Sequence, residues 1–174
     1  MFNLGEATFI NVTTANNETF GIVNDNGVFN MTNSIIADNR ADNCDNRNST
    51  GTWVSNGTNL ADDSSCGLAP GSDFQVSNAG LKPLADYGGE TPTHALLHTS
   101  PALDVGNNTV CAATPVNNVD QRGETRPYNT TCDIGAFESH TRACNVTANS
   151  GSSLETSFAD NACSPIVVPE GTYQ

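Results

Sequence analysis

PLADYGG, at residues 83–89, opens the stretch that decides the fold, which runs over residues 81–138. Five further segments follow it in order: PTHALL (92–97), SPALDVG (100–106), DQRG (120–123), RP (126–127) and CDIGAFE (132–138). Asp104 and Asp133 each stand two positions before a glycine, a spacing that favours an Asp-capped turn ahead of a left-handed glycine. These two spacings therefore predict turns at Asp104 and Asp133.

These six segments, in this order, resemble the C-terminal end of secreted bacterial and archaeal surface proteins that fold as right-handed parallel β-helices. That family, usually labelled choice-of-anchor, shows PLADNGG, PTHALL and SPAID-G, then DQRG, RP and CDIGAFE. The resemblance implies an all-β fold, a right-handed parallel β-helix with a short capping helix near the C-terminus. It assigns residues 1–140 to coils and a C-terminal cap, with 81–138 forming the last coils and the cap. It also implies an extracellular or cell-surface location.

Composition agrees with an all-β chain. Of the 174 residues, 36% are hydrophobic and 14% are charged, so the polarity comes mainly from uncharged Asn, Thr, Ser and Gly. These residues suit turns and ladders of identical side chains on stacked strands. The length allows one domain with a core.

The chain is acidic, with a formal net charge of −13. We expect no nucleic-acid partner, because phosphate binding requires clustered cations, and no anionic membrane surface. The acidity favours solubility, and bound Ca²⁺ is the sharper alternative. No apolar run approaches the roughly 20 residues of a membrane span, and residues 1–10 show no signal peptide, so an exported form would be mature or a fragment.

The six cysteines form three pairs that are close in sequence: Cys44/Cys66, Cys111/Cys132 and Cys144/Cys163. Fifteen connectivities are possible, and we favour the local one because each pair encloses a coil-sized segment. Zinc is a poor alternative, because no two cysteines have half-site spacing. Three disulfides indicate an oxidising compartment.

Sequons are frequent and spread along the chain. Asn-x-Ser/Thr occurs at eight positions: Asn11, Asn17, Asn30, Asn48, Asn56, Asn107, Asn129 and Asn145. We expect glycans on several of them, chiefly in loops, because an inward-facing asparagine is not accessible.

Residues 6–39 are predicted to form β-helix coils, because apolar segments at Phe9-Ile10 and 29–36 recur about one coil apart. Two ordinary hairpins are the alternative, since the Asn26-Gly27 pair favours a tight turn. Residues 40–80 are rich in Asn, Asp, Ser and Gly, and we interpret them as a long excursion between coils, closed by Cys44–Cys66.

Residues 141–174 resemble the N-terminal cap of the same β-helix families. Ser152 and Glu155 have capping-box spacing, which predicts a short helix, and a strand and turn follow over 166–173. We expect this segment to dock on the open first coil of a neighbouring subunit and build a head-to-tail homopolymer. The expected contact residues are Leu154, Phe158, Ile166, Val167, Val168 and Tyr173. A tail that merely opens a following tandem domain is the alternative.

No catalytic or metal centre is expected. His94 and His98 lack the zincin pattern; His94 matches a structural histidine of the family, and His98 stands where the family has Pro. The acidic candidates for acid–base work are Asp62, Asp63, Asp86, Glu90, Asp104, Asp120, Asp133 and Glu138. Arg122 and Arg126 have acidic neighbours, which favours a buried Arg–carboxylate pair that holds the last coil.

The predicted function is therefore structural: a secreted filament-forming or adhesive surface protein that is not an enzyme and needs no cofactor. A carbohydrate-binding or polysaccharide-degrading β-helix protein is the alternative, and surface glycans are its expected ligands.

Overall fold

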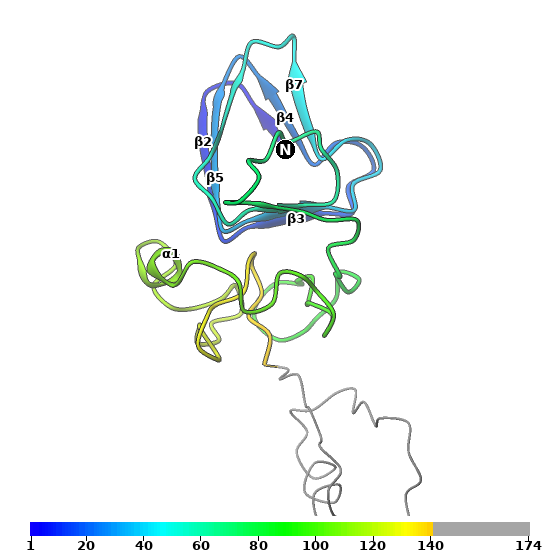
Figure 1. Ribbon diagram of the computed structural model, residues 1–174. Coiled ribbons are helices and arrows are strands. Elements are labelled where there is room, and N and C mark those ends of the chain that lie inside the picture. Colours follow the sequence, from blue (N-terminus) through cyan, green and yellow to red (C-terminus); the bar gives the residue numbers. More distant parts are fainter. Residues whose placement is uncertain (141–174) are drawn as a thin grey trace, which may run out of the picture. The chain divides into compact units, whose positions relative to one another are not determined.

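A computed structural model describes residues 1–140, which are almost entirely strand and loop. Ten strands form three parallel sheets (Figure 1). The first sheet holds β1 (Phe2–Asn3), β4 (Ile22–Asp25) and β7 (Cys44–Arg47). The second holds β2 (Glu6–Ile10), β5 (Val28–Thr32) and β8 (Thr52–Ser55). The third is ordered β10-β9-β6-β3, from β3 (Thr13–Ala15), β6 (Ile35–Ala37), β9 (Leu60–Ala61) and β10 (Phe74–Gln75).

Successive turns of the chain contribute one strand to each sheet. Ala7 pairs with Phe29, which pairs in turn with Trp53, and Thr13 pairs with Ile35 in the same way. The hairpin alternative is wrong for residues 6–39, because β4 and β5 flank Asn26-Gly27 but belong to different sheets. The all-β prediction with parallel sheets is confirmed at this level.

Asparagine forms the corners between sheets and a ladder inside one of them. Asn11 and Asn33 both have φ 52°, a left-handed conformation that Asn tolerates better than most residues. At the first sheet, Asn3 Nδ2 donates to Asn24 Oδ1 at 2.9 Å, and Asn24 is aligned with Asn46 of the next turn. The high asparagine content is thus used for repeated corners and stacked amides, as the composition predicted.

The space enclosed by the three sheets is an apolar core. Phe29 and Met31 of β5, Ile22 of β4 and Ile36 of β6 are all almost completely buried there. The rings of Phe9, Phe29 and Trp53 stack from one turn to the next, with centroid distances of 4.8 and 5.0 Å. Strand residues that alternate with these point outward, which explains the partial alternation in the sequence.

Residues 40–61 are not an excursion, so that prediction is wrong. They form a third turn whose strands β7, β8 and β9 stand in register with the second turn. The polar sequence is compatible with this, because Asn46, Ser55 and Asn59 bond to backbone or neighbouring side chains. Between β9 and β10, residues 62–73 form turns and bends with one isolated bridge.

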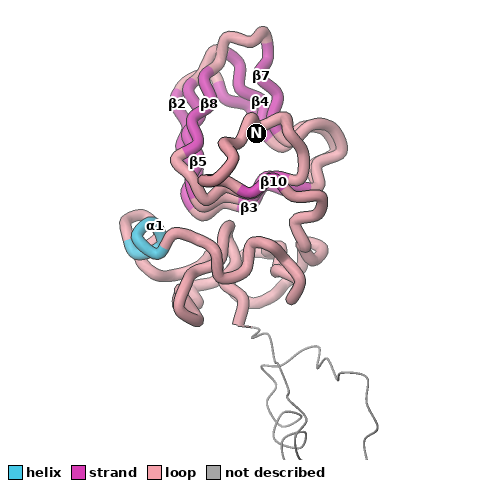
Figure 2. Tube along the Cα trace, in the orientation of Figure 1, coloured by secondary structure: helices cyan, strands magenta, loops and turns pink. Residues whose placement is uncertain are grey.

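Residues 81–138 do not form further coils, which corrects the prediction for this stretch. They consist of turns, isolated bridges and one short helix, α1 (Asn108–Ala112), and they pack beside the third sheet (Figures 1 and 2). Ile35, Ala37 and Leu60 point outward from that sheet and join Leu96 and Ile134 in a second apolar cluster. The third sheet is therefore buried on both faces.

Gly135 marks the closest approach of this segment to the sheet. Its φ is +92°, and a Cβ at this position would lie 2.5 Å from Thr13 Oγ1 and 2.8 Å from Ile35 Cδ1. Its N–H donates to the Asn33 carbonyl at 2.8 Å, and the next residue, Ala136, donates to Thr13 Oγ1 at 3.0 Å. Only glycine fits this position.

The capping helix predicted near residue 152, the strand over 166–173 and the six subunit-contact residues lie outside the described residues. Helix α1 was not predicted; Asn107 caps it, because its Oδ1 accepts the N–H of Thr109. In the described part of the chain, no helix has the length and apolar character needed to cross a membrane.

Candidate functional site

Two of the predicted local cysteine pairs are disulfides. Cys44 is joined to Cys66, with a Cα–Cα distance of 4.9 Å, and Cys111 to Cys132, with 6.8 Å. The first bond ties β7 to the loop that follows β9, and the second ties helix α1 to the CDIGAFE segment. The predicted pair Cys144–Cys163 lies outside the described residues.

The sequon asparagines differ in accessibility. Asn11 is buried, and its Nδ2, the atom that would carry a glycan, donates to the Gly135 carbonyl at 3.3 Å in the interior. Asn11 is therefore withdrawn as a candidate. The candidates Asn17, Asn48, Asn56 and Asn107 are exposed, Asn30 and Asn129 are half-buried, and Asn145 lies outside the described residues.

Asp120 is the most heavily bonded carboxylate of the 81–138 stretch. Its oxygens accept the backbone N–H groups of Arg122, Glu124 and Glu138, and the Arg122 guanidinium lies 2.7 Å away. Burial alone would raise the pKa of this carboxyl, but the N–H of Glu138 and the donors of Arg122 hold it below its usual value. Asp120 is thus ionised and fixed by its donors.

Arg126 and Glu138 form a second, fully buried pair. The Nε of Arg126 lies 3.6 Å from the Glu138 carboxylate, and Nη1 donates to the Gly135 carbonyl at 3.0 Å. Glu138 also accepts the N–H groups of Tyr128 and Asp133. Burial raises the pKa of Glu138, opposed by these donors and by Arg126. The arrangement matches the predicted buried Arg–carboxylate pair.

Asp133 is held between two distant parts of the chain. Its oxygens accept the N–H of Asp104 at 2.7 Å and of Ser139 at 2.6 Å. Burial nevertheless raises the pKa of Asp133 to about 7. Of the predicted Asp-capped turns, only the positive φ of Gly135 is observed: the Asp133 carboxylate bonds to Asp104 and Ser139 rather than to its own turn, Gly106 has no positive φ, and Asp104 itself has φ 54°.

The remaining acidic candidates do not converge on one centre. Asp86 and Glu90 are exposed, and Asp86 accepts the N–H of Gly88 in a local turn. Asp62 and Asp63 follow β9 directly in the sequence, and their carboxylates accept hydrogen bonds from Asn43 and Ser65. Their hydrogen bonds are to turns of the stacked part, which is a structural use of carboxylates.

The two histidines considered as metal ligands, His94 and His98, have different surroundings. His94 Nδ1 donates to the Lys82 carbonyl at 2.8 Å, whereas His98 is exposed. Among residues 1–140, no group of His, Cys, Asp or Glu side chains has the arrangement of a metal site.

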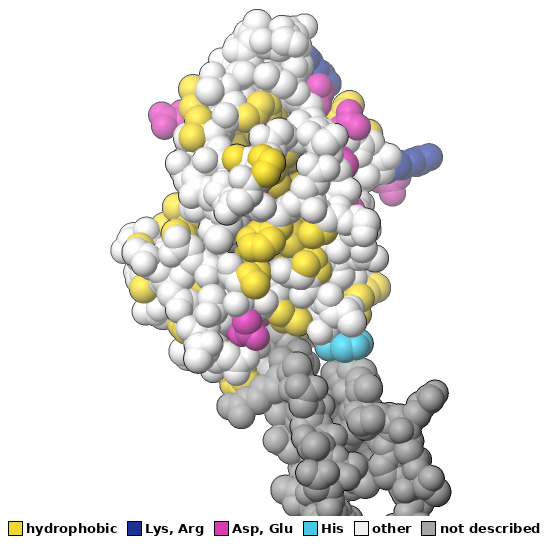
Figure 3. Space-filling model, viewed as in Figure 1, with side chains coloured by type: hydrophobic (Ala, Val, Ile, Leu, Met, Phe, Trp, Pro, Cys, Tyr) yellow, Lys and Arg dark blue, Asp and Glu magenta, His cyan; other side chains and the backbone are white. Residues whose placement is uncertain are grey.

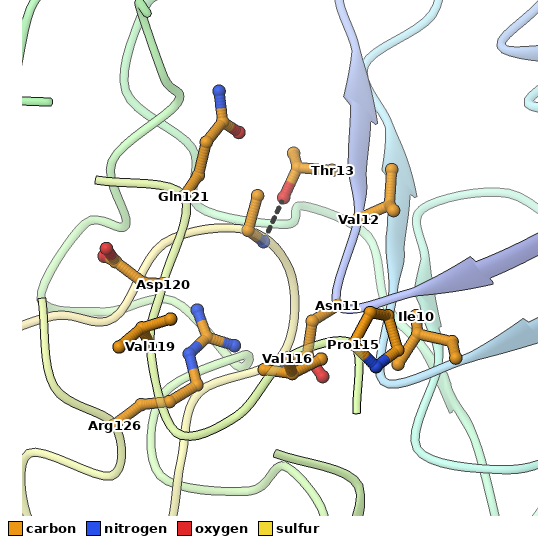
Figure 4. Close-up of a pocket in the computed structure, with 11 residues that line it drawn as sticks. Ile10, Asn11, Val12, Thr13, Pro115, Val116, Val119, Asp120, Gln121 and Arg126 are labelled. Atoms are coloured by element: carbon orange, nitrogen blue, oxygen red, sulfur yellow. Dashed lines mark hydrogen bonds between the residues drawn. The ribbon is translucent and has the colours of Figure 1, made fainter. Parts of the chain in front are cut away.

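A pocket of about 320 Å³ lies where the 81–138 stretch meets the corner between β2 and β3. Most of its wall is apolar: Ile10, Val12, Pro115, Val116, Val119 and Ala136. Figure 4 shows the Arg126 guanidinium inside the ring of lining residues, while Gln121 points away from it. Within the described residues, Arg126 Nη2 has no hydrogen-bond partner although Arg126 is 1% exposed.

Sequence reasoning missed this pocket. It identified Arg126 as one half of an ion pair, and the segment after β2 as part of a coil, but nothing in the spacing placed residues 10–13 beside 115–126. The sequence signal for the pocket is a group of three apolar side chains, Pro115, Val116 and Val119, in an otherwise polar loop.

Comparisons with protein-family models, with curated proteins and with solved structures find no match to this chain.

Proposed function

We propose that this chain is a secreted structural protein of the cell surface, built as a right-handed parallel β-helix of the choice-of-anchor type. Three turns of chain follow the same path through three parallel sheets, which supports the helical architecture. Connections between parallel strands of one sheet are right-handed in nearly all proteins, which supports the handedness.

The observation that carries the proposal is the free edge of the second sheet. Within residues 1–140, strand β2 pairs with β5 on one side only, and Ala7 and Phe9 of β2 are only partly buried against the core. Such an edge pairs readily with an added strand, and the ring of Phe9 continues the aromatic stack toward it.

The proposed occupant of this edge is residues 141–174 of a second copy. The sequence predicts a strand over 166–173 in that segment, preceded by a helix with Leu154 and Phe158 on one face. Ile166, Val167, Val168 and Tyr173 are the proposed contact residues of the strand. A contact that joins two different surfaces and does not close on itself builds a filament.

A secreted location is supported by the two disulfides and by the exposed sequons. On the face drawn in Figure 3, most of the surface is uncharged polar side chain and backbone, hydrophobic side chains form a strip down its middle, and charged groups are few. Such a surface suits an adhesive or glycan-covered protein rather than one that binds nucleic acid.

A structural rather than catalytic role is supported by the use of the carboxylates. Asp120, Asp133 and Glu138 each accept two or more backbone N–H groups, so their removal would expose unsatisfied donors.

The alternative, a carbohydrate-binding or polysaccharide-degrading protein, is favoured by one groove. It lies between the third sheet and residues 81–94 and is lined by hydrogen-bonding side chains such as Asn16, Asn39, Lys82 and His94. These groups suit sugar hydroxyls.

Deletion of residues 141–174 tests the proposal. Native mass spectrometry and electron microscopy of the intact chain should show head-to-tail polymers, and the shortened chain should be monomeric. A control chain with Leu84→Ser, which changes an exposed side chain away from β2, should polymerise normally. Monomeric intact protein, or polymers that survive the deletion, would rule out this assembly.

A further inference from the structure

The pocket beside Arg126 combines apolar walls with one cationic side chain, that of Arg126. Ile10, Val12 and Val116 line it with apolar groups, and the Asn11 side chain is already bonded to Gly135 and Asn33. The lining side chain with uncommitted polar hydrogens is Arg126, whose Nη2 lacks a partner among the described residues. A buried donor without a partner is destabilising, so an acceptor that reaches this solvent-inaccessible atom through the pocket would satisfy it.

The carboxylates near Arg126 leave its Nη2 without a hydrogen bond among the described residues. Asp120 is matched by Arg122 at 2.7 Å and by backbone donors. Glu138 approaches only the Nε side of Arg126, at 3.6 Å, which is too long for a hydrogen bond. Among the described residues, Nη2 therefore makes no hydrogen bond to either carboxylate, although both carboxylates interact with the charge of Arg126.

The pocket connects with solvent and has room for a ring-sized molecule. Pro115, Val119 and Gln121 line it and are exposed. Its volume of about 320 Å³ exceeds that of an engineered cavity of roughly 150 Å³ that holds benzene. An apolar body and one small polar group fit together in this space.

We propose that this pocket binds a carboxylate carried on an apolar body, with the carboxylate on Arg126 Nη2 and the body against Ile10, Val12 and Val116. Guanidinium–carboxylate contacts are among the strongest hydrogen bonds in proteins. A sugar is a poor fit, because most of its hydroxyls would face apolar walls. The ligand is either a free organic acid or the C-terminal carboxylate of a peptide that ends in an apolar residue.

Benzoate and benzyl alcohol test the role of Arg126, because they share a ring and differ in charge. Titration of the full-length chain, followed by NMR shifts of the Asn11 and Ala136 amides, should show benzoate binding at least tenfold more tightly. Equal affinities, or no saturable benzoate binding up to about 10 mM, would overturn the proposal and leave Arg126 Nη2 to a buried water.

A matched pair of variants tests the location. Val119 is 43% exposed and lines the pocket, so Val119→Trp should fill it and weaken benzoate binding tenfold or more. Val28 is 41% exposed on β5, and Val28→Trp should leave binding unchanged. Equal behaviour of the two variants would contradict the assignment.

The peptide Gly-Phe and its C-terminal amide separate the two sources of the carboxylate. If Gly-Phe binds at least tenfold more tightly than benzoate and the amide loses this gain, the pocket is a site for chain ends. If benzoate binds as tightly as Gly-Phe, the pocket is a site for free organic acids.

Discussion

Residues 1–76 and residues 79–139 keep their shapes by different means. In the first region, each strand pairs with the equivalent strand of the next turn, and side chains pack against their counterparts there. In the second, backbone hydrogen bonds form α1, isolated bridges and turns rather than ladders, and buried carboxylates accept further N–H groups. The fold of the first region is therefore stabilised by strand pairing repeated from turn to turn, whereas that of the second region is stabilised by individual side chains.

The largest test of this contrast is Asp120→Asn. The substitution removes the charge opposite Arg122, which is 10% exposed, and turns an amide toward backbone donors such as the N–H of Glu138. We expect a loss of about 3–5 kcal/mol in the free energy of unfolding, because one partner of a buried ion pair is removed. Denaturant titration measures it.

The control for that substitution is Asp86→Asn. Asp86 is exposed and accepts one local N–H, from Gly88 at 2.9 Å, so its replacement should change stability little. If both variants lose the same stability, the buried carboxylates do not hold the segment.

The disulfides give the next test, because they close loops of similar length in the two regions. Their sequence separations are 21 for Cys111–Cys132 and 22 for Cys44–Cys66, so loop entropy predicts about 3 kcal/mol for either. The regions should nevertheless respond differently. Replacing Cys111 and Cys132 by Ser should remove amide-exchange protection from residues 100–139 and spare β4 to β6.

Replacing Cys44 and Cys66 should lower stability without this local loss, because backbone ladders hold β7 beside β4. Loss of protection in β4 to β6 from the Cys111/Cys132 variant would show that the two regions unfold as one unit.

A smaller effect is expected from the asparagine ladder. Asn24 is fully buried, and its Nδ2 donates to the carbonyls of Gly27 and Thr52 at 3.0 and 3.1 Å. Asn24→Ala should cost about 1–3 kcal/mol, because these acceptors lose their donor. Asn30→Ala, at a half-buried position on β5, is the comparison and should cost less. Equal costs in thermal unfolding would argue against a structural ladder.

The pH dependence of stability gives the most gradual effect, spread over several pH units. Burial raises the pKa of Asp133 to about 7, whereas the unfolded chain releases this proton near pH 4. The folded state therefore binds more protons between these values, and stability falls as pH rises through about 7, by no more than about 1.4 kcal/mol per unit. Asp133→Asn removes this slope.

The measurement is the Tm of both chains from pH 5 to pH 8, because their difference isolates Asp133 from the other carboxyls. If the difference stays constant, or if the native protein gains stability with pH, the two backbone donors keep Asp133 ionised. Carbon-13 NMR of the Asp133 carboxyl gives the titration directly.

The repeated region was predictable in outline from residues 6–39, because apolar residues recur one turn apart. Residues 40–61 escaped the same reasoning, because the third turn places Trp53 and Ser55 where the second has Phe29 and Met31. The strands of this third turn are held by backbone hydrogen bonds to the strands of the second turn. A polar sequence can therefore occupy it without apolar periodicity of its own.

The 81–138 stretch was predicted as further coils and a cap, and only local features of it were foreseen. The sequence indicated a buried Arg–carboxylate pair and the Cys111–Cys132 bond, both of which are local in sequence. It did not indicate that Gly135 lies against Thr13 and Ile35, because no periodicity links residues so far apart. The Arg126 pocket depends on that docking and was missed with it.

The packing of the 81–138 stretch on the third sheet also has a consequence for folding during synthesis. Asn11 and Gly135, which bond in the finished fold, are 124 residues apart. At roughly 5–20 residues per second, about 6–25 s separate the appearance of one from that of the other on the ribosome. If the strands pair as they are made, the outer face of the third sheet, with Ile35 and Leu60, forms before the segment that covers it has been synthesised. The nascent chain therefore carries a bare apolar surface late into translation, where it is a binding site for chaperones and a starting point for aggregation.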